Sequence, residues 1–89
     1  MTQMFFTSHL KALVPNQPLE TPGNTVAEAL EAAFQKHPLL RHYIVDEAGV
    51  MREHVCVFVD GERFGHRTAL RQPVRENAEI YVMQALSGG

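Results

Sequence analysis

The stretch His54-Val55-Cys56-Val57-Phe58-Val59-Asp60-Gly61 alternates valines with other side chains and then ends in an aspartate–glycine pair. Valine and phenylalanine are enriched in strands, and Asp-Gly is favoured in two-residue hairpin turns because both residues tolerate positive φ. The stretch therefore predicts a strand that turns at Asp60-Gly61, with Glu62-Arg63-Phe64 as the return strand. Successive strand residues face opposite sides, so the three valines share one face while Cys56 and Phe58 share the other.

A final strand is predicted at Glu79-Ile80-Tyr81-Val82-Met83. Its alternation would place Ile80 and Val82 beside the three valines, on the side that forms the core. The small-residue stretch 85–89 follows this strand almost directly. We therefore expect one domain over residues 1–84 and a flexible tail over residues 85–89.

The opposite face of these two strands would carry Phe58, Tyr81 and Met83, which form an apolar patch outside the core. Two explanations of this patch stay open. The side chains could pack beneath the segment from Arg41 to Glu53, as ordinary loop-covered residues do. They could instead form a docking surface beside the tail, since aromatic residues and methionine are enriched at the centres of interfaces.

Only one long helix is predicted. Thr25 and Glu28 have the spacing of a capping box, in which the threonine accepts a backbone hydrogen bond and the glutamate three residues later reaches back. Apolar residues recur at helical spacing from Val26 to Phe34, and Pro38 ends the pattern because a proline disfavours the helical conformation of the residue before it. The apolar run 39–45 fits a short helical turn or a strand equally well.

The N-terminal third is predicted to supply the remaining strands. Met4-Phe5-Phe6-Thr7 predicts a first strand, which the apolar residues 10–14 could continue past a turn. The prolines at positions 15, 18 and 22 leave room only for a short edge strand at Leu19-Glu20-Thr21. One helix that covers one face of a mixed sheet of four to five strands predicts an α+β roll.

The composition is that of an ordinary single-domain protein. The 89 residues have a formal net charge of −2, and the eight lysines and arginines are scattered, which argues against a nucleic-acid-binding protein. No apolar run is long enough to cross a membrane, and the N-terminal residues lack the pattern of a signal peptide. We therefore expect a cytoplasmic protein that binds neither nucleic acid nor membrane.

Few residues could carry chemistry of their own. Cys56 is the only cysteine, so neither an internal disulfide nor a four-cysteine iron–sulfur site can be built. The five histidines lack the spacing of a metal site, and the sequence contains no glycine-rich phosphate-binding loop. We predict a protein that binds no metal or cofactor itself and is not an independent enzyme.

The order of these elements, the strand Val55–Val59 with its Asp60-Gly61 turn, the strand 79–83 and the terminal Gly88-Gly89 together resemble the MoaD/ThiS family of ubiquitin-like sulfur carriers. The resemblance covers nearly the whole chain and implies a ubiquitin-like β-grasp fold. The usual asparagine–glycine of such hairpins is aspartate–glycine here. The segment Leu39–His54 looks more like carriers for cysteine or specialised-metabolite sulfur than like the shorter molybdopterin and thiamine carriers.

The resemblance implies that the reacting group is the carboxylate of Gly89, with Leu86, Ser87 and Gly88 as the tail that delivers it. A ubiquitin-activating-like adenylyltransferase would adenylate this carboxylate with its own ATP and Mg. A sulfurtransferase or sulfide source would supply the sulfur, and the resulting thiocarboxylate would pass to a sulfur-accepting synthase.

The tail composition suits this use on physical grounds. The six residues from Gln84 to Gly89 span roughly 20 Å when extended, at about 3.3 Å per residue, which is enough to reach a buried pocket in a partner. Glycine has no Cβ, so Gly88 and Gly89 would let the backbone pass through a narrow entrance to such a pocket.

Two other functions stay open. The chain could be a ubiquitin-like modifier, in which a lysine of another protein attacks the activated Gly89 to form an isopeptide bond. It could instead be a β-grasp interaction domain with no terminal chemistry, in which case the loss of Gly88-Gly89 would change nothing.

Overall fold

The computed structural model describes residues 1–84, apart from the side chain of Ser8; the predicted tail, residues 85–89, lies outside the described residues. The strands are β1 (Thr2–Phe6), β2 (Leu19–Thr21), β3 (Val55–Val59), β4 (Glu62–Phe64) and β5 (Glu79–Gln84). The helices are α1 (Val26–Lys36) and α2 (Leu39–Ile44), and the short 3₁₀ helices are η1 (Ser8–Leu13) and η2 (Ala69–Arg71).

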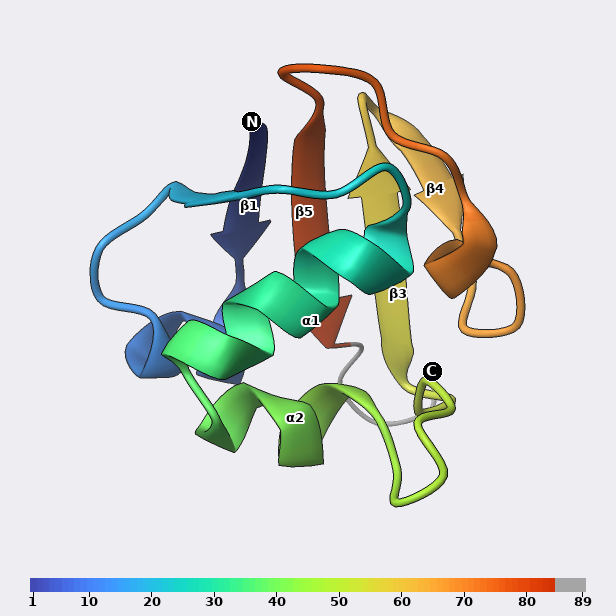
Figure 1. Cartoon of the computed structure of the whole chain (residues 1–89). Coiled ribbons are helices and arrows are strands. Elements are labelled where there is room, and N and C mark those ends of the chain that lie inside the picture. The colour runs from blue at the N-terminus through green and yellow to red at the C-terminus, as the bar shows by residue number, and fades with distance from the viewer. Residues whose placement is uncertain (85–89) are drawn as a thin grey trace.

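The strands form one sheet in the order β2-β1-β5-β3-β4. The pair β1–β5 is parallel and the other three pairs are antiparallel, so the sheet is mixed. Figure 1 shows α1 lying across one face of this sheet, with α2 beside it. The predicted α+β roll with one main helix is confirmed, with five strands.

The core lies between α1 and the sheet, and it contains the residues that the alternation predicted. All three valines of β3 are buried, as are Ile80 and Val82 of β5. The apolar face of α1 meets them through Val26, Ala29, Leu30, Ala33 and Phe34. Burying a side chain of this size stabilises the fold by roughly 1.5 to 3 kcal/mol relative to leaving it exposed.

The N-terminus of α1 is fixed by side chains and by a close backbone approach. The Thr25 hydroxyl accepts a hydrogen bond from the Glu28 backbone N–H at 3.2 Å, as predicted, and the Glu28 carboxylate reaches back to accept from the N–H of Asn24 at 2.8 Å. Gly23 just before this cap has a φ of 144°, and a Cβ there would lie 2.8 Å from the backbone nitrogen of Ala29. Only glycine fits at this position without strain.

The ambiguous run 39–45 forms the short helix α2, in which Leu40 and Ile44 are buried. Arg41 connects α2 to α1 by donating two hydrogen bonds to the carboxylate of Glu31, at 3.0 and 2.7 Å, and its guanidinium lies 4.8 Å from the ring centroid of Phe34. The hydrogen bond from Arg41 lowers the pKa of Glu31 below its ordinary value. Because both side chains of the ion pair are exposed, we assign it no large contribution to stability.

The N-terminal region differs from the expectation in one respect. The run 10–14 does not continue the first strand; residues 10–13 belong to η1, which places Leu10 in the core while Lys11 and Ala12 are exposed. Apolar residues at positions 10 and 13, three apart, share one side of a 3₁₀ turn, and this spacing competes with a strand interpretation of so short a run. The predicted edge strand β2 is confirmed.

The hairpin between β3 and β4 turns at Asp60 and Gly61, with φ values of 49° and 89°, as the Asp-Gly pair predicted. The aspartate does more than turn the chain. Its carboxylate accepts hydrogen bonds from the Glu79 backbone N–H at 3.0 Å and from Arg75 Nε at 3.1 Å. Asp60 therefore ties the end of β3 to the beginning of β5.

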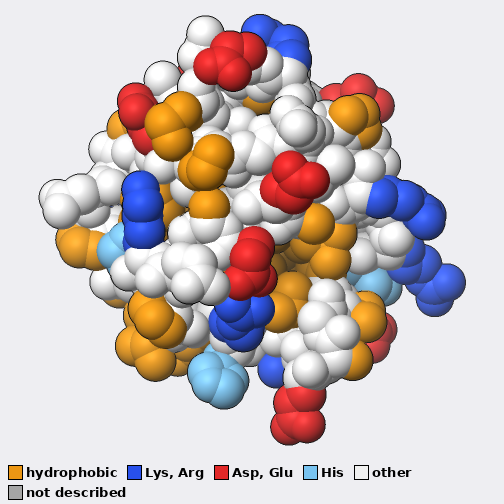
Figure 2. Space-filling view, in the orientation of Figure 1, with side chains coloured by type: hydrophobic (Ala, Val, Ile, Leu, Met, Phe, Trp, Pro, Cys, Tyr) orange, Lys and Arg blue, Asp and Glu red, His pale blue; other side chains and the backbone are white. Residues whose placement is uncertain are grey.

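Figure 2 views the molecule from the side of α1 and α2, where acidic, basic and apolar side chains are interspersed. Within residues 1–84, no helix has the length and apolar character needed to cross a bilayer.

Substitution of Gly23 by alanine should lower the free energy of unfolding by roughly 1 to 3 kcal/mol, because the new Cβ would clash with the first turn of α1. The control is Gly65→Ala, where a Cβ would meet no atom within 4 Å and the change should stay below about 0.5 kcal/mol. Urea unfolding of both variants measures the difference. Equal stabilities of the two variants would contradict this account of the helix start.

Substitution of Asp60 by alanine should cost roughly 1 to 2 kcal/mol, because it removes the acceptor for the Glu79 N–H and places alanine at positive φ. Asp60→Asn keeps an oxygen acceptor and tolerates positive φ, so it should cost less than about 1 kcal/mol through the partly exposed Arg75 ion pair alone. Thermal or urea unfolding compares the two variants. If asparagine proved as damaging as alanine, charge rather than the acceptor would hold the turn.

Candidate functional site

The sheet face opposite α1 carries a cluster of apolar side chains, which we call the open face. It is formed by Phe5 of β1, Cys56 and Phe58 of β3, and Tyr81 and Met83 of β5. Four of these side chains are half-buried, and Tyr81 is 38% exposed. Because strand residues alternate between faces, each of them stands beside a core residue that points the other way.

An aromatic row crosses three adjacent strands of the open face. Phe5 pairs with Tyr81 in the parallel β1–β5 ladder, and Tyr81 pairs with Phe58 in the antiparallel β5–β3 ladder. The rings of Phe5 and Tyr81 stack with their centroids 4.5 Å apart and their planes inclined by 10°. Such stacking contributes roughly 0.5 to 1.5 kcal/mol beyond burial, so it holds Tyr81 in a defined orientation at the surface.

A second row lies next to the aromatic row, toward the end of β5. Here Cys56 pairs with Met83, and one residue further Val55 pairs with Gln84, the last residue of the strand. Residues 85–89 follow Gln84 directly. The open face therefore extends to the point at which the predicted tail begins.

A shallow groove of about 540 Å³ runs over the open face; it is lined by Thr7, Phe58, Asp60, Gly61, Glu79, Tyr81 and Met83. Among the described residues that line it, none comes from the segment Arg41–Glu53. Of the two explanations of the apolar patch, packing beneath that segment is therefore not what the structure shows. The groove is walled by apolar side chains, and carboxylates are found only toward the β3–β4 turn.

The structure brings together three of the residues predicted for the site, Phe58, Tyr81 and Met83. The other predicted site residues, Leu86, Ser87, Gly88 and Gly89, lie outside the described residues.

The sequence interpretation missed Phe5. Its alternation with the buried residues Met4 and Phe6 was visible in the sequence, and this alternation placed it on the outer face of its strand. The parallel pairing of β1 with β5, which puts its ring against Tyr81, had no local signal.

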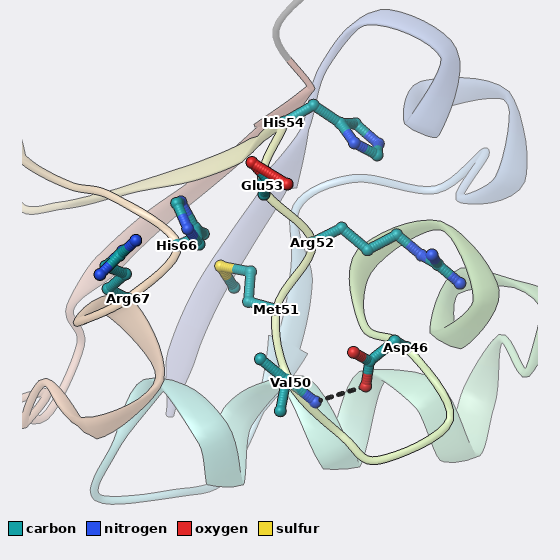
Figure 3. Close-up of a pocket in the computed structure, with 8 residues that line it drawn as sticks. All are labelled: Asp46, Val50, Met51, Arg52, Glu53, His54, His66 and Arg67. Atoms are coloured by element: carbon teal, nitrogen blue, oxygen red, sulfur yellow. Dashed lines mark hydrogen bonds between the residues drawn. The ribbon is translucent and has the colours of Figure 1, made fainter.

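A larger cleft of about 660 Å³ lies at the end of the sheet where β5 ends, and Figure 3 shows its lining. It is bounded by Asp46, the segment 50–54, His66 and Arg67. The side chains of this cleft do not converge on one point: Arg52 points away from His66 and Arg67. Arg52 therefore does not face the same point as His66 and Arg67.

Several polar groups of this cleft already serve the local structure. One oxygen of Asp46 accepts from the backbone N–H groups of Ala48 and Val50, at 2.9 and 3.0 Å. Arg52 Nε donates to the backbone carbonyl of His42 at 2.8 Å. Among residues 1–84, no three histidine, cysteine, aspartate or glutamate side chains are grouped so that they could hold a metal ion.

Searches of family models and of curated proteins found no match to this chain. Several solved structures match it over nearly its whole length, including the following three. The crystal structure of SAMP1 from Haloferax volcanii is 23% identical in sequence with a TM-score of 0.80, covering 99% of this chain and 98% of that one.

The crystal structure of the BexX/CysO complex of Amycolatopsis orientalis matches with 20% identity and a TM-score of 0.83, covering 100% of both chains. The solution structure of small archaeal modifier protein 1 (SAMP1) from Methanosarcina acetivorans matches with 18% identity and a TM-score of 0.86, covering 99% of this chain and 95% of that one. This similarity shows the fold: the chain has the ubiquitin-like β-grasp fold that the resemblance drawn from the sequence implied.

Proposed function

We propose that this chain is a cytoplasmic sulfur-carrier protein, a cosubstrate rather than an enzyme. Its C-terminal carboxylate, on Gly89, is adenylated by a ubiquitin-activating-like enzyme and then converted to a thiocarboxylate. The thiocarboxylate donates its sulfur to a synthase that builds cysteine, molybdopterin, thiamine or another sulfur metabolite.

The observation that carries this proposal is the position of Gly88-Gly89, a few residues after the last strand of a β-grasp fold. Two glycines by themselves are a weak signal. The signal is more specific here, because the two glycines follow β5 in a fold that this chain shares with SAMP1 and with the chain matched in the BexX/CysO complex. The CysO complex also shows that a protein of this fold can be seated against a partner protein.

The chemistry explains why the carrier needs a partner. A carboxylate is a poor electrophile because it is anionic and resonance-stabilised. Attack of a Gly89 oxygen on the α-phosphate of ATP gives an acyl adenylate and releases pyrophosphate. Hydrosulfide then attacks the acyl carbon and AMP leaves, so a C–S bond replaces the C–O bond to AMP and loss of a proton gives the thiocarboxylate.

The enzyme is proposed to supply ATP, Mg and the catalytic groups, since the sequence of the carrier contains no glycine-rich phosphate-binding loop. In the larger cleft, Asp46 and Arg52 are both hydrogen-bonded to backbone groups. A general acid or base needs to lie within hydrogen-bond reach of the reacting atom, and the side chains here point in different directions.

The open face is proposed to dock the partner while the tail enters its active site. Phe58, Tyr81 and Met83 lie together beside the beginning of the tail, and Phe5 stiffens the aromatic row by stacking on Tyr81. Partly exposed aromatic side chains held in one orientation lose little conformational entropy on binding, and such residues dominate interface energetics.

A second candidate is the ubiquitin-like modifier, which the similarity to SAMP1, a small archaeal modifier protein, favours. Both functions begin with the same adenylate of Gly89. They differ in the nucleophile, because a lysine amine of a target protein would give an isopeptide-linked adduct larger than the free chain.

Incubation with ATP, Mg, a ubiquitin-activating-like enzyme and sulfide should increase the intact mass by the difference between one sulfur and one oxygen atom. A variant that lacks Gly88-Gly89 should gain nothing, because its new terminus lacks the glycines that reach the active site. Intact-mass spectrometry measures both proteins. Oxidation of Met83 gives a nearly equal mass gain, so fragmentation must place the change at residue 89.

If neither adenylate nor thiocarboxylate forms on the full-length chain, the proposal of terminal chemistry fails and the interaction domain becomes the better explanation. Adducts of higher mass with other proteins, formed only by the full-length chain, would favour the modifier.

Substitution of Tyr81 by alanine should raise the KM of the activating enzyme for this protein by about tenfold or more and leave kcat unchanged, because it removes docking contact but not the reacting tail. The matched control is Tyr43→Ala on α2, since Tyr43 is 45% exposed and lies away from the groove. Pyrophosphate exchange measures both constants. Equal KM values for the two variants would exclude the open face as the docking surface.

A further inference from the structure

The aromatic row of the open face ends in a charged residue. Arg63 of β4 pairs with Phe58, so residues from four adjacent strands follow one another in the order Phe5, Tyr81, Phe58, Arg63. Residues directly opposite one another in a ladder project from the same face of the sheet. Arg63 is exposed, and it pairs with Phe58, which lines the groove.

The guanidinium of Arg63 has no ionic partner within residues 1–84. The ion pairs there join the N-terminus to Glu76, Arg41 to Glu31, and Arg75 to Asp60. Asp60 lines the groove, but its carboxylate accepts hydrogen bonds from the Glu79 N–H and from Arg75 Nε, one on each oxygen. The charge of Arg63 is therefore not neutralised within the described domain.

We propose that the protein partner of the open face presents a large apolar side chain to the groove and, beside it, an aspartate or glutamate that pairs with Arg63. This inference rests on the proposed function, because it specifies the partner that docks while the tail reacts. Arginine beside aromatic side chains is the composition typical of interface hot spots. Contact between the aromatic row and the apolar anchor excludes water, which strengthens the neighbouring charge pair.

The proposed ion pair between Arg63 and the partner is a local interaction and does not follow from the net charge of the chain. The whole chain has a formal net charge of −2, so a partner steered only by net charge would carry a basic surface. An acidic side chain opposite Arg63 is thus a specific expectation, contrary to what net charge alone predicts. Arginine also suits this role better than lysine, because its planar fork matches a carboxylate through two parallel hydrogen bonds.

The test is the concentration dependence of pyrophosphate exchange by the activating enzyme, with Arg63→Glu as the principal variant. We expect its KM to rise at least about tenfold at unchanged kcat, since like charges at the interface repel while the terminal carboxylate is unaltered. Arg63→Lys should give a smaller rise because it keeps the charge. Raising the salt concentration from about 50 mM to about 500 mM should raise the wild-type KM more than that of Arg63→Ala.

The matched control is Arg71→Glu, which makes the same change of charge at an exposed arginine of η2, an element that packs against α1. Its KM should equal that of the wild type. Circular dichroism and thermal unfolding of each variant show whether the fold is retained, and Arg63→Ala provides a second variant that introduces no repulsion.

Three results would overturn the inference. If the wild type is activated but Arg63→Glu and Arg63→Ala keep its KM, the inference fails and the proposed function stands. If Arg71→Glu is as impaired as Arg63→Glu, net charge rather than a local pair governs docking. If the wild type itself is never adenylated, the proposed function fails and this inference fails with it.

Discussion

The central position of β5 in the sheet is the constraint on which the rest of the structure depends. Its ladders to β1 on one side and to β3 on the other determine which residues meet on both faces. On the inner face they place Ile80 and Val82 among the core residues beneath α1. On the outer face the same ladders align Phe5, Tyr81 and Phe58, and the strand ends where residues 85–89 begin.

This arrangement separates two tasks that the proposed carrier function would require. Stability comes from the inner face, where close packing against α1 leaves the apolar side chains dry. The proposed recognition uses the outer face, where the apolar side chains are half-buried or exposed. Substitutions on the outer face can therefore change partner affinity without unfolding the domain, which makes the proposed function open to experiment.

Much of the fold could be predicted because its signals are local. The alternation of the β3 valines, the Asp60-Gly61 turn and the cap formed by Thr25 and Glu28 each depend on neighbouring residues, and the structure has all three. The run 10–14 was assigned incorrectly because a short apolar run fits a strand and a 3₁₀ turn alike.

The candidate site was predictable only in part, because some of its residues follow from alternation within one strand and others follow from pairing between strands. Phe58, Tyr81 and Met83 follow from alternation within two strands. Phe5 joins them through the pairing of β1 with β5, two strands that lie far apart in the sequence, and no local pattern reports such pairing. Arg63 lies opposite Phe58 through the β3–β4 hairpin, which the Asp60-Gly61 pair did predict. The Gly89 chemistry stays a prediction drawn from the sequence and the resemblance, since that residue lies outside the described part of the chain.

The most direct measurement of the central claim is the chemical state of Gly89 in protein isolated from its own cells. Alkylation followed by trypsin releases residues 76–89 as one peptide, since no lysine or arginine follows Arg75, and this peptide lacks Cys56, the only cysteine. Its alkylation therefore reports a terminal thiocarboxylate. The account predicts a fraction of this peptide with sulfur in place of one oxygen and an alkyl group at residue 89. A peptide that ends only in an unmodified carboxylate, in cells actively making sulfur metabolites, would contradict it.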